Sequence, residues 1–161
     1  MMAVAAEEII FRKMTLDDLP QILMIEQDSF TTPWTKEAFT NELTNNLFAQ
    51  YMAMEYRGQV IGYGGMWIIV DEAHITNIAI VAQYRSQGLG KLLMYELQRT
   101  AVFLGAVRMT LEVRKSNVIA QRLYRSYGFE NAGIRPGYYS DNNEDALIMW
   151  AELPQAENGG A

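Results

Sequence analysis

The stretch Asn77-Ile78-Ala79-Ile80-Val81, followed three residues later by Arg85-Ser86-Gln87-Gly88-Leu89-Gly90, decides how this chain folds. The first segment is apolar and rich in isoleucine and valine, which favours a strand. Beyond the second segment, from Leu89 to Leu104, leucines recur at helical spacing. A helix start carries unpaired N–H groups and the positive end of the helix dipole. Because glycine has no Cβ, the backbone lets a phosphate come close, so the turn predicts a seat for a diphosphate.

The spacing Arg-x-x-Gly-x-Gly differs from the two phosphate motifs known best. It is neither the Gly-x-x-x-x-Gly-Lys loop of nucleoside triphosphates nor the Gly-x-Gly-x-x-Gly of dinucleotides. Two glycines two apart also suit a tight turn before a core helix, which is the plain structural alternative. The flanking elements favour the anion seat, because that seat requires a strand before the turn and a helix after it.

The hydrophobic pattern predicts, in chain order, a strand, two helices, three strands, a helix, a strand, a helix and two strands. Strand–helix–strand crossovers imply parallel pairing and hairpins imply antiparallel pairing, so the class is mixed α/β. Glycines at 62, 64 and 65 predict a bend or bulge in their strand. We expect one domain over residues 8–153 with tails at 1–7 and 154–161. The expected elements cover 9–11, 16–26, 36–45, 48–55, 60–70, 73–81, 89–104, 107–113, 120–127, the region of Ile134, and 146–153.

Composition narrows the chemistry. The 161 residues include no cysteine and one histidine, which excludes disulfides and thiolate chemistry and makes a metal site improbable. The first residues lack a signal-peptide pattern and no apolar run is long enough to cross a membrane, so we expect a cytoplasmic protein. The net charge of −6 disfavours direct nucleic-acid binding and suits a basic peptide, although solubility alone explains it too. Glu26, Asp28 and Glu42 are candidates for receiving such a peptide.

The chain resembles a known family. The strand, Arg-Ser-Gln-Gly-Leu-Gly turn and helix are similar to the acetyl-coenzyme A motif of the GCN5-related N-acetyltransferases (GNAT). Further segments, collinear from about residue 8 to 153, resemble the branch that acetylates the N-terminal alanine of a ribosomal protein. The resemblance implies the GNAT fold, a mixed and mostly antiparallel sheet of about seven strands with helices on both faces. It also implies that acetyl-CoA binds at the splay between the two central parallel strands. The further segments are Pro33-Trp34-Thr35, Leu111-Glu112-Val113-Arg114, Ser116-Asn117, Leu123-Tyr124, Tyr127-Gly128-Phe129, Tyr138-Tyr139 and Glu144-Asp145-Ala146.

Two side chains are candidates for catalysis. Glu112 interrupts an apolar strand; by period two alone it faces solvent, opposite Leu111 and Val113. The resemblance implies instead that Glu112 is the general base, acting directly or through a water. Tyr124 shares the apolar face of a helix, where a tyrosine is ordinarily a core residue. The resemblance implies that Tyr124 is the general acid that protonates the coenzyme A sulfur.

The resemblance also implies cofactor and substrate contacts. Asn117 would contact coenzyme A, although a helix N-cap explains it equally well. Trp34, Tyr138 and Tyr139 are candidate walls of a peptide groove, with ordinary aromatic packing as the alternative. Two departures from the family are Ser86-Gln87, less basic than in some relatives, and the bulkier Val118-Ile119. The residues implied for the pantetheine and pyrophosphate are Ile78, Ala79, Ile80, Arg85, Ser86, Gln87, Gly88, Leu89, Gly90 and Lys91.

The implied activity is transfer of acetyl from acetyl-CoA to the N-terminal α-amine of a ribosomal protein's alanine, by direct attack in a ternary complex. Small-subunit ribosomal protein eighteen is the expected substrate. An α-amine loses its proton more readily than lysine, with a pKa of about 8 against about 10.4. The alternatives are acetylation of other N-termini, lysines or small amines, and a non-catalytic acyl-CoA-binding module. The expected partners are coenzyme A and a basic peptide, without metal, nucleic acid or membrane; the oligomeric state stays open.

Overall fold

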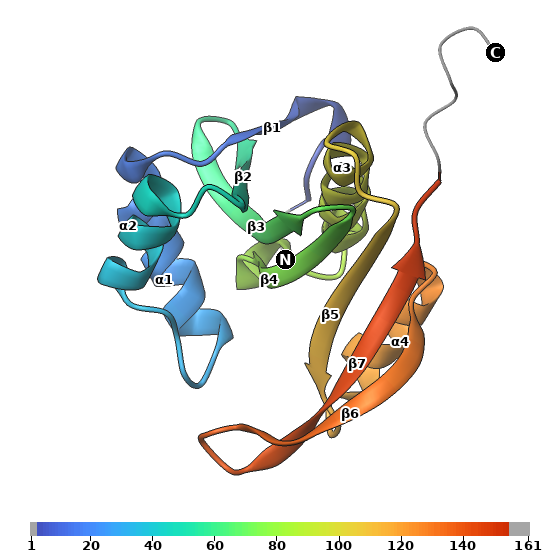
Figure 1. Ribbon diagram of the computed structural model, residues 1–161. Coiled ribbons are helices and arrows are strands. Elements are labelled where there is room, and N and C mark those ends of the chain that lie inside the picture. The colour runs from blue at the N-terminus through green and yellow to red at the C-terminus, as the bar shows by residue number, and fades with distance from the viewer. Residues whose placement is uncertain (1–2, 155–161) are drawn as a thin grey trace, which may run out of the picture. The chain divides into compact units, whose positions relative to one another are not determined.

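A computed structural model describes residues 3–154 of the protein (Figure 1). The predicted order of helices and strands is confirmed. Short 3₁₀ turns, labelled η, precede β1, α1 and the loop before α3. The elements are η1 (Ala6–Glu8), β1 (Ile9–Lys13), η2 (Leu16–Asp18), α1 (Leu19–Ser29), α2 (Lys36–Asn45), β2 (Ala49–Tyr56), β3 (Gln59–Ile69), β4 (Glu72–Ile80), η3 (Ala82–Tyr84), α3 (Leu89–Phe103), β5 (Arg108–Arg114), α4 (Val118–Ser126), β6 (Glu130–Tyr139) and β7 (Glu144–Glu152).

The seven strands follow the order β1-β2-β3-β4-β5-β7-β6. β4 and β5 pair in parallel, whereas β1–β2, β2–β3, β5–β7 and β6–β7 are antiparallel. The predicted mixed, mostly antiparallel sheet is therefore confirmed. The predicted bulge is confirmed too, because the register of β2 with β3 shifts where Met54 faces Gly62 and Glu55 faces Val60.

Two boundaries differ from the sequence prediction. The α-helix expected from Leu16 begins at Leu19, after one turn of 3₁₀ helix, and Asp18 accepts a hydrogen bond from the Thr15 N–H at 2.8 Å there. β6 is longer than expected because its register with β7 shifts between Arg135 and Tyr139. That shift accommodates residues 136 and 137, a Pro-Gly pair that ordinarily ends a strand.

The chain divides into two compact units, which we describe one at a time. Unit 1 contains the residues up to Trp67 together with Thr76–Leu97. Unit 2 contains Ile68–Ile75 together with the residues from Gln98 onward. One domain over residues 8–153 stays a prediction; of the predicted tails, residues 3–7 and 154 are described, with Ala6 and Glu7 in η1, and the other tail residues lie outside the described part of the chain. Within residues 3–154, no helix combines the length and apolar character that a membrane crossing needs.

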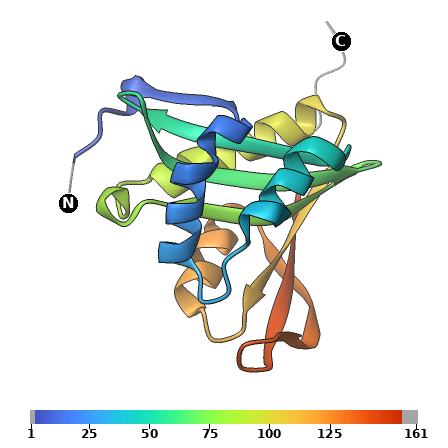
Figure 2. The same ribbon diagram turned by 90° about the vertical axis from the view of Figure 1, so that its left-hand side faces the viewer.

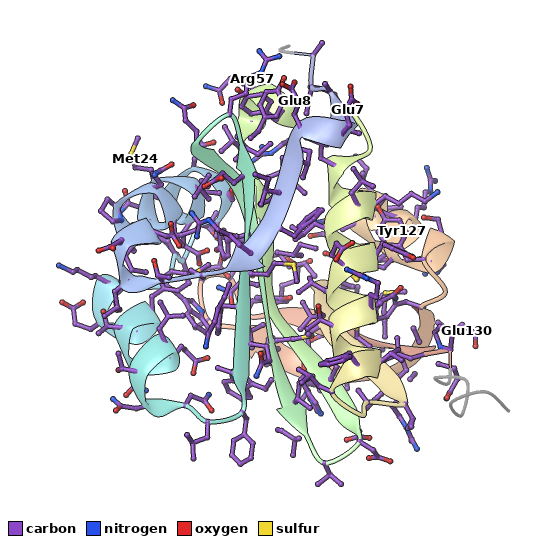
Figure 3. The ribbon with its side chains drawn as sticks, turned by 90° about the horizontal axis from the view of Figure 1, so that it is seen from above. Glu7, Glu8, Met24, Arg57, Tyr127 and Glu130 are labelled. Atoms are coloured by element: carbon purple, nitrogen blue, oxygen red, sulfur yellow. The ribbon has the colours of Figure 1, made fainter. Side chains whose placement is uncertain are left out.

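Unit 1 is a sheet with helices on both faces. Figure 2 shows α1 and α2 lying across the strands, and Figure 3 shows the start of α3 on the opposite side. The core on the α1–α2 face centres on aromatic rings, with Phe39 5.9 Å from Tyr63 and 6.3 Å from Tyr51, both edge to face. The neighbouring glycines leave room for these contacts, since a Cβ at Gly65 would overlap the Tyr51 ring and one at Gly64 would lie 2.7 Å from Leu97 of α3.

Two buried carboxylates join the helices of unit 1 to its strands. Glu26 of α1 is 2% exposed and accepts hydrogen bonds from the Trp34 N–H at 3.0 Å and from the Tyr63 hydroxyl. Glu42 of α2 accepts from the Tyr51 hydroxyl at 2.9 Å and the Trp67 indole at 2.6 Å. The expectation that these two acids receive a basic peptide is therefore wrong, because their oxygens are used inside the protein.

Unit 2 is a smaller sheet covered by α4. It combines the first half of β4 with β5, β7 and β6, and α4 lies behind β6 and β7 in Figure 1. Its buried apolar residues include Leu111 and Val113 of β5, Phe129, and Met149 of β7, each at most 5% exposed. The Thr110 hydroxyl donates to the Met149 carbonyl at 2.9 Å, which satisfies its buried oxygen.

Replacing the buried acid of α1, Glu26→Gln, is expected to flatten the pH dependence of the free energy of unfolding. Burial raises the pKa of Glu26, partly offset by hydrogen bonds from Trp34 and Asn77, so the folded protein keeps a proton that the unfolded chain releases. The free energy of unfolding of the wild-type protein therefore falls as the pH rises from the usual pKa of a carboxyl group through the raised pKa of Glu26 in the folded protein. Glutamine does not titrate, so the variant lacks this fall. Urea unfolding between about pH 4 and pH 8 measures it.

The matched control is Asp28→Asn, an acid-to-amide change on the same helix at a side chain that is 65% exposed. It should keep the wild-type slope. An unchanged slope in Glu26→Gln would contradict the assignment of a raised pKa to this carboxyl group.

Candidate active site

In unit 1 the predicted cofactor strand ends at the glycine turn. Along β4, Asn77 and Ala79 are buried, whereas Ile78 and Ile80 are half-buried. The Val81 N–H donates to the Ile61 carbonyl at 2.8 Å, and this bond fixes the end of the strand against β3. This hydrogen bond therefore sets the position of the chain where it leaves β4 towards the glycine turn.

The turn itself has the open backbone that a diphosphate seat requires. Ser86 and Gly88 have positive φ of 64° and 79°. A Cβ built at Gly88 or at Gly90 would meet no atom within 4 Å. The α-helix begins at Leu89, as predicted, with Lys91 exposed in its first turn. The backbone of this turn therefore fits an approaching phosphate.

Arg85 and Gln87 are tied to the surrounding structure. The Arg85 guanidinium donates to the Ile80 carbonyl at 2.9 Å and to the Ser29 hydroxyl at 3.1 Å, and lies 4.0 Å from Asp28. It thus links the end of α1 to the end of β4. Gln87 accepts a hydrogen bond from the Val4 N–H at 3.0 Å. Both residues shape the turn, and their contact with a phosphate stays a prediction.

A cleft of about 900 Å³ lies beside this turn, in unit 1. Its lining residues include four glutamines and one acid but no cation, so the cleft lacks the charge expected of a diphosphate site. The lining of this cleft therefore does not favour a diphosphate, and the glycine turn stays the predicted site for it. The lining consists of Gln21, Met24, Ile25, Gln27, Asp28, Gln59, Val60, Val81, Ala82 and Gln83.

In unit 2 Glu112 faces away from the core, as period two predicts. Leu111 and Val113 on the opposite face are 2% and 5% exposed. The Glu112 side chain is nevertheless only 23% exposed, and its carboxylate lies 3.3 Å from the Arg135 guanidinium of β6. It is therefore a paired carboxylate in a sheltered position.

Tyr124 has the features expected of a proton donor. Its ring contacts Phe129 edge to face at 6.0 Å, and burial, with a smaller contribution from Tyr127, raises its pKa to about 12. The hydroxyl therefore stays protonated at neutral pH. Tyr124 is half-buried, and no hydrogen bond within residues 3–154 engages its hydroxyl, which solvent can therefore reach.

The Tyr138–Tyr139 pair lies close to both catalytic candidates. The two rings meet edge to face at 5.1 Å. Burial raises the pKa of Tyr139 to about 12, with smaller electrostatic effects from Arg114, Tyr138, Glu112 and Tyr124. Gly137, with φ of 60°, sits in the register shift just before the pair and donates its N–H to Asp145 at 2.9 Å. Unit 2 thus gathers the two catalytic candidates with two of the predicted groove residues.

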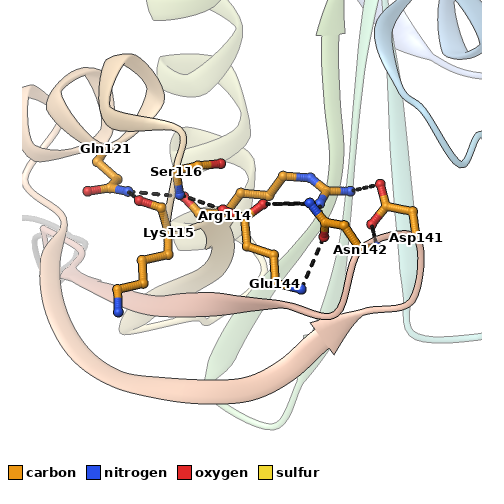
Figure 4. Close-up of polar contacts among 7 residues, drawn as sticks. All are labelled: Arg114, Lys115, Ser116, Gln121, Asp141, Asn142 and Glu144. Atoms are coloured by element: carbon orange, nitrogen blue, oxygen red, sulfur yellow. Dashed lines mark hydrogen bonds and ion pairs between the residues drawn. The ribbon is translucent and has the colours of Figure 1, made fainter.

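Arg114 holds this part of unit 2 together (Figure 4). Its guanidinium pairs with Asp141 at 2.9 Å and Glu144 at 3.3 Å and lies over the Tyr139 ring at 4.0 Å. Glu144 also accepts from the Ser116 N–H at 2.6 Å. The β6–β7 turn is therefore fastened to the turn between β5 and α4.

Sequence reasoning did not single out Arg114 or Arg135 as site residues. Arg114 was identifiable, because it follows Glu112 by two and must share its face of the strand. No comparable pattern pointed to Arg135, because the Pro-Gly pair that follows it ordinarily ends a strand.

For Asn117 and Trp34 the structure supports the structural alternatives. The Asn117 side chain caps α4 by accepting from the Ala120 N–H at 3.1 Å. The Trp34 ring packs 5.3 Å from Phe39 in unit 1. Contacts of these residues with coenzyme A or a peptide stay predictions. Val118 and Ile119 are 47% and 81% exposed, so their bulk lies at the surface of α4.

The chain belongs to the acetyltransferase (GNAT) family, whose model matches residues 19–129. It is 47% identical over 142 residues to a Bacillus subtilis (strain 168) protein provisionally named a [ribosomal protein bS18]-alanine N-acetyltransferase, covering 88% of this chain and 94% of that one. It is 36% identical over 136 residues to the [ribosomal protein bS18]-alanine N-acetyltransferase of Escherichia coli (strain K12), covering 82% and 89%.

A crystal structure of the Escherichia coli ribosomal-protein-S18-alanine N-acetyltransferase is similar to this chain, with a TM-score of 0.83 and 33% identity over 93% of this chain and 97% of that one. The family and the fold implied by the sequence resemblance are therefore confirmed. Family membership makes acetyl-CoA the co-substrate class of this protein.

Placing a methyl group in the glycine turn, Gly88→Ala, is expected to weaken acetyl-CoA binding about tenfold or more, because the Cβ takes the space where a phosphate would approach. The positive φ also costs about 1 kcal/mol of stability. Isothermal titration calorimetry with acetyl-CoA measures the affinity.

Gly58→Ala controls for the backbone cost. Gly58 has the same φ of 79° and the same open surroundings, and it also lies in unit 1, in the turn between β2 and β3. This variant should lose similar stability and keep wild-type affinity. If both variants bound acetyl-CoA with equal affinity, the phosphate would not bind at the glycine turn.

Proposed function

We propose that the chain transfers the acetyl group of acetyl-CoA to the N-terminal α-amine of ribosomal protein bS18, at its alanine. The observation that carries the proposal is that one unit contains both the sheltered Glu112 carboxylate and a Tyr124 hydroxyl that solvent can reach. The names of the Bacillus subtilis and Escherichia coli relatives support the substrate.

Acetyl-CoA supplies the acetyl group as an activated thioester. In the proposal Ile78, Ala79 and Ile80 hold its pantetheine through backbone amides, and the turn Arg85 to Lys91 holds its pyrophosphate. The open backbone at Gly88 and Gly90 supports the second part. Asn117 is proposed to add a contact from the start of α4.

Glu112 is proposed as the general base. An α-ammonium must lose a proton before its nitrogen can attack, and a carboxylate within reach accepts that proton directly or through a water. The pairing of Glu112 with Arg135 supports this role, since it shows the carboxylate at a sheltered but reachable position.

Tyr124 is proposed as the general acid. When the carbon–sulfur bond breaks, the departing thiolate needs a proton, and the Tyr124 hydroxyl holds one at neutral pH. Its phenolate is then neutralised from solvent before the next cycle. The accessibility of this hydroxyl, which no hydrogen bond within residues 3–154 engages, supports the role.

The acceptor is proposed to be a basic peptide bound along Tyr138 and Tyr139 of unit 2, and a peptide contact of Trp34 in unit 1 stays a separate prediction. Aromatic walls hold a peptide backbone without selecting one sequence. The acidic net charge favours a cationic partner. With acetyl-CoA and a ribosomal protein as substrates, the proposed place of the reaction is the cytoplasm.

Removing the proposed base, Glu112→Gln, is expected to lower kcat about 100-fold or more at neutral pH while leaving acetyl-CoA binding near wild type. Tyr124→Phe should lower kcat about tenfold or more, since water can partly replace a proton donor. Steady-state kinetics with an Ala-initiated bS18 peptide measures both. Glu130→Gln, a matched change at an exposed carboxylate of β6, should have no effect. Full turnover in Glu112→Gln would remove this residue from the mechanism.

Mass spectrometry of the peptide after incubation with acetyl-CoA should place the acetyl group on the α-amine and not on lysine. At pH 7 the free-base fraction of an α-amine exceeds that of lysine more than about 100-fold. A peptide blocked at its N-terminus controls for lysine reaction. Preferential acetylation of lysine or of a polyamine would overturn the substrate, and turnover of no amine would leave a binding module only.

A further inference from the structure

Arg135 and Glu112 meet on one face of the unit 2 sheet. In the register Glu112 lies opposite Ile148, and Arg114 and Arg135 both lie opposite Ala146. Positions 146 and 148 are two apart on β7, so all three charged side chains project to the same side. The ion pair of Glu112 with Arg135, at 3.3 Å, therefore spans the intervening strand β7 on this face.

The pair is placed where it can act on a ligand. The Arg135 side chain is 56% exposed, and its guanidinium also lies 5.9 Å from the Tyr138 ring centre. It is therefore a cation fixed between the proposed base and the proposed peptide wall. No ion pair other than that with Arg135 reaches the Glu112 carboxylate within the described part of the chain.

We propose that Arg135 is a positioning residue that orients the Glu112 carboxylate and, through its charge, favours the free amine of the acceptor over the ammonium ion. This inference rests on the proposed role of Glu112 as general base. Arg135 moves no proton itself. The amine proton still passes to Glu112 and the Tyr124 proton to the leaving sulfur.

The physical reason is the net charge that the acceptor meets. An isolated carboxylate binds an ammonium ion strongly and so holds the amine in its unreactive form. With a guanidinium beside it the pair is close to neutral, so the ammonium gains less from binding and gives up its proton at lower pH. A paired carboxylate also keeps one orientation, which a general base needs for proton transfer.

Other titratable or charged side chains also face this pair. They are the same in wild type and in every variant below, so they cannot create a difference between them. They are His74 of β4, which lies opposite Thr110, together with Arg114, Tyr138, Tyr139 and Glu144; Tyr124 lies near Tyr139 of this group.

The test is the pH profile of kcat for the Ala-initiated bS18 peptide in Arg135→Gln. The rising limb should move to higher pH by about 0.5 to 1 unit, the size expected for loss of a like charge near a partly exposed group. At pH 7 kcat should fall about three- to tenfold, while the KM of the peptide stays equal or falls, because the ammonium ion now binds more tightly.

Two further variants separate charge from structure. Arg135→Lys keeps the positive charge, so the rising limb of its kcat–pH profile should lie at the same pH as in wild type. Arg125→Gln removes an exposed arginine of α4 that donates a 3.4 Å hydrogen bond to Asn131, and it should change nothing. If Arg135→Gln fails to fold, Arg135→Ala takes its place with the same expected shift.

A fall in kcat that is equal at all pH values would overturn the proposal, and so would a lysine variant that behaves like the glutamine variant. An inactive wild type would overturn the proposed function and this inference together. An active wild type with an unshifted limb would overturn the role of Arg135 alone.

Discussion

A carboxylate can stay in a protein interior only if its oxygens are satisfied, and unit 1 is organised around that demand. Leaving a buried charge without partners costs several kcal/mol, comparable to the whole stability of a small domain. Three segments supply hydrogen-bond donors to Glu26: strand β3, strand β4 and the turn that follows α1. The same hydrogen bonds therefore fix the helix, the turn that carries Trp34 and the strand that leads to the glycine turn.

In unit 2 one face of the sheet carries several polar side chains while the other face packs into the core. The period of two along β5 places Glu112 and Arg114 on that face and Leu111 and Val113 on the other. The register shift in β6 then allows the Tyr138–Tyr139 pair to approach the same region. A single local irregularity in β6 thus brings two aromatic rings towards the Glu112 carboxylate of β5.

The sequence predicted the parts of the fold that depend on local pattern. Leu89 as the first residue of α3 and the bulge near Gly62 depend on glycine and leucine spacing, which is visible in one segment, and the 36–45 helix is likewise visible in its local sequence. The burial of Glu26 and Glu42 was not predictable, because each is satisfied by residues distant in the chain. Arg135 was missed for the same reason, since its partner Glu112 lies on a strand that is not adjacent to β6. The roles of Glu112 and Tyr124 came from a family resemblance, while the structure contributed their pairing, exposure and surroundings.

β6 stands last in the strand order, so one side of its backbone has no further strand of the sheet beside it among residues 3–154. Such an edge invites pairing with another polypeptide, and proteins guard against it with proline, charge and irregular register. Pro136 lacks an N–H to offer, Arg135 adds a charge, and the shift between Arg135 and Tyr139 interrupts the regular ladder. The irregularity that shapes the tyrosine pair therefore also discourages edge-to-edge aggregation.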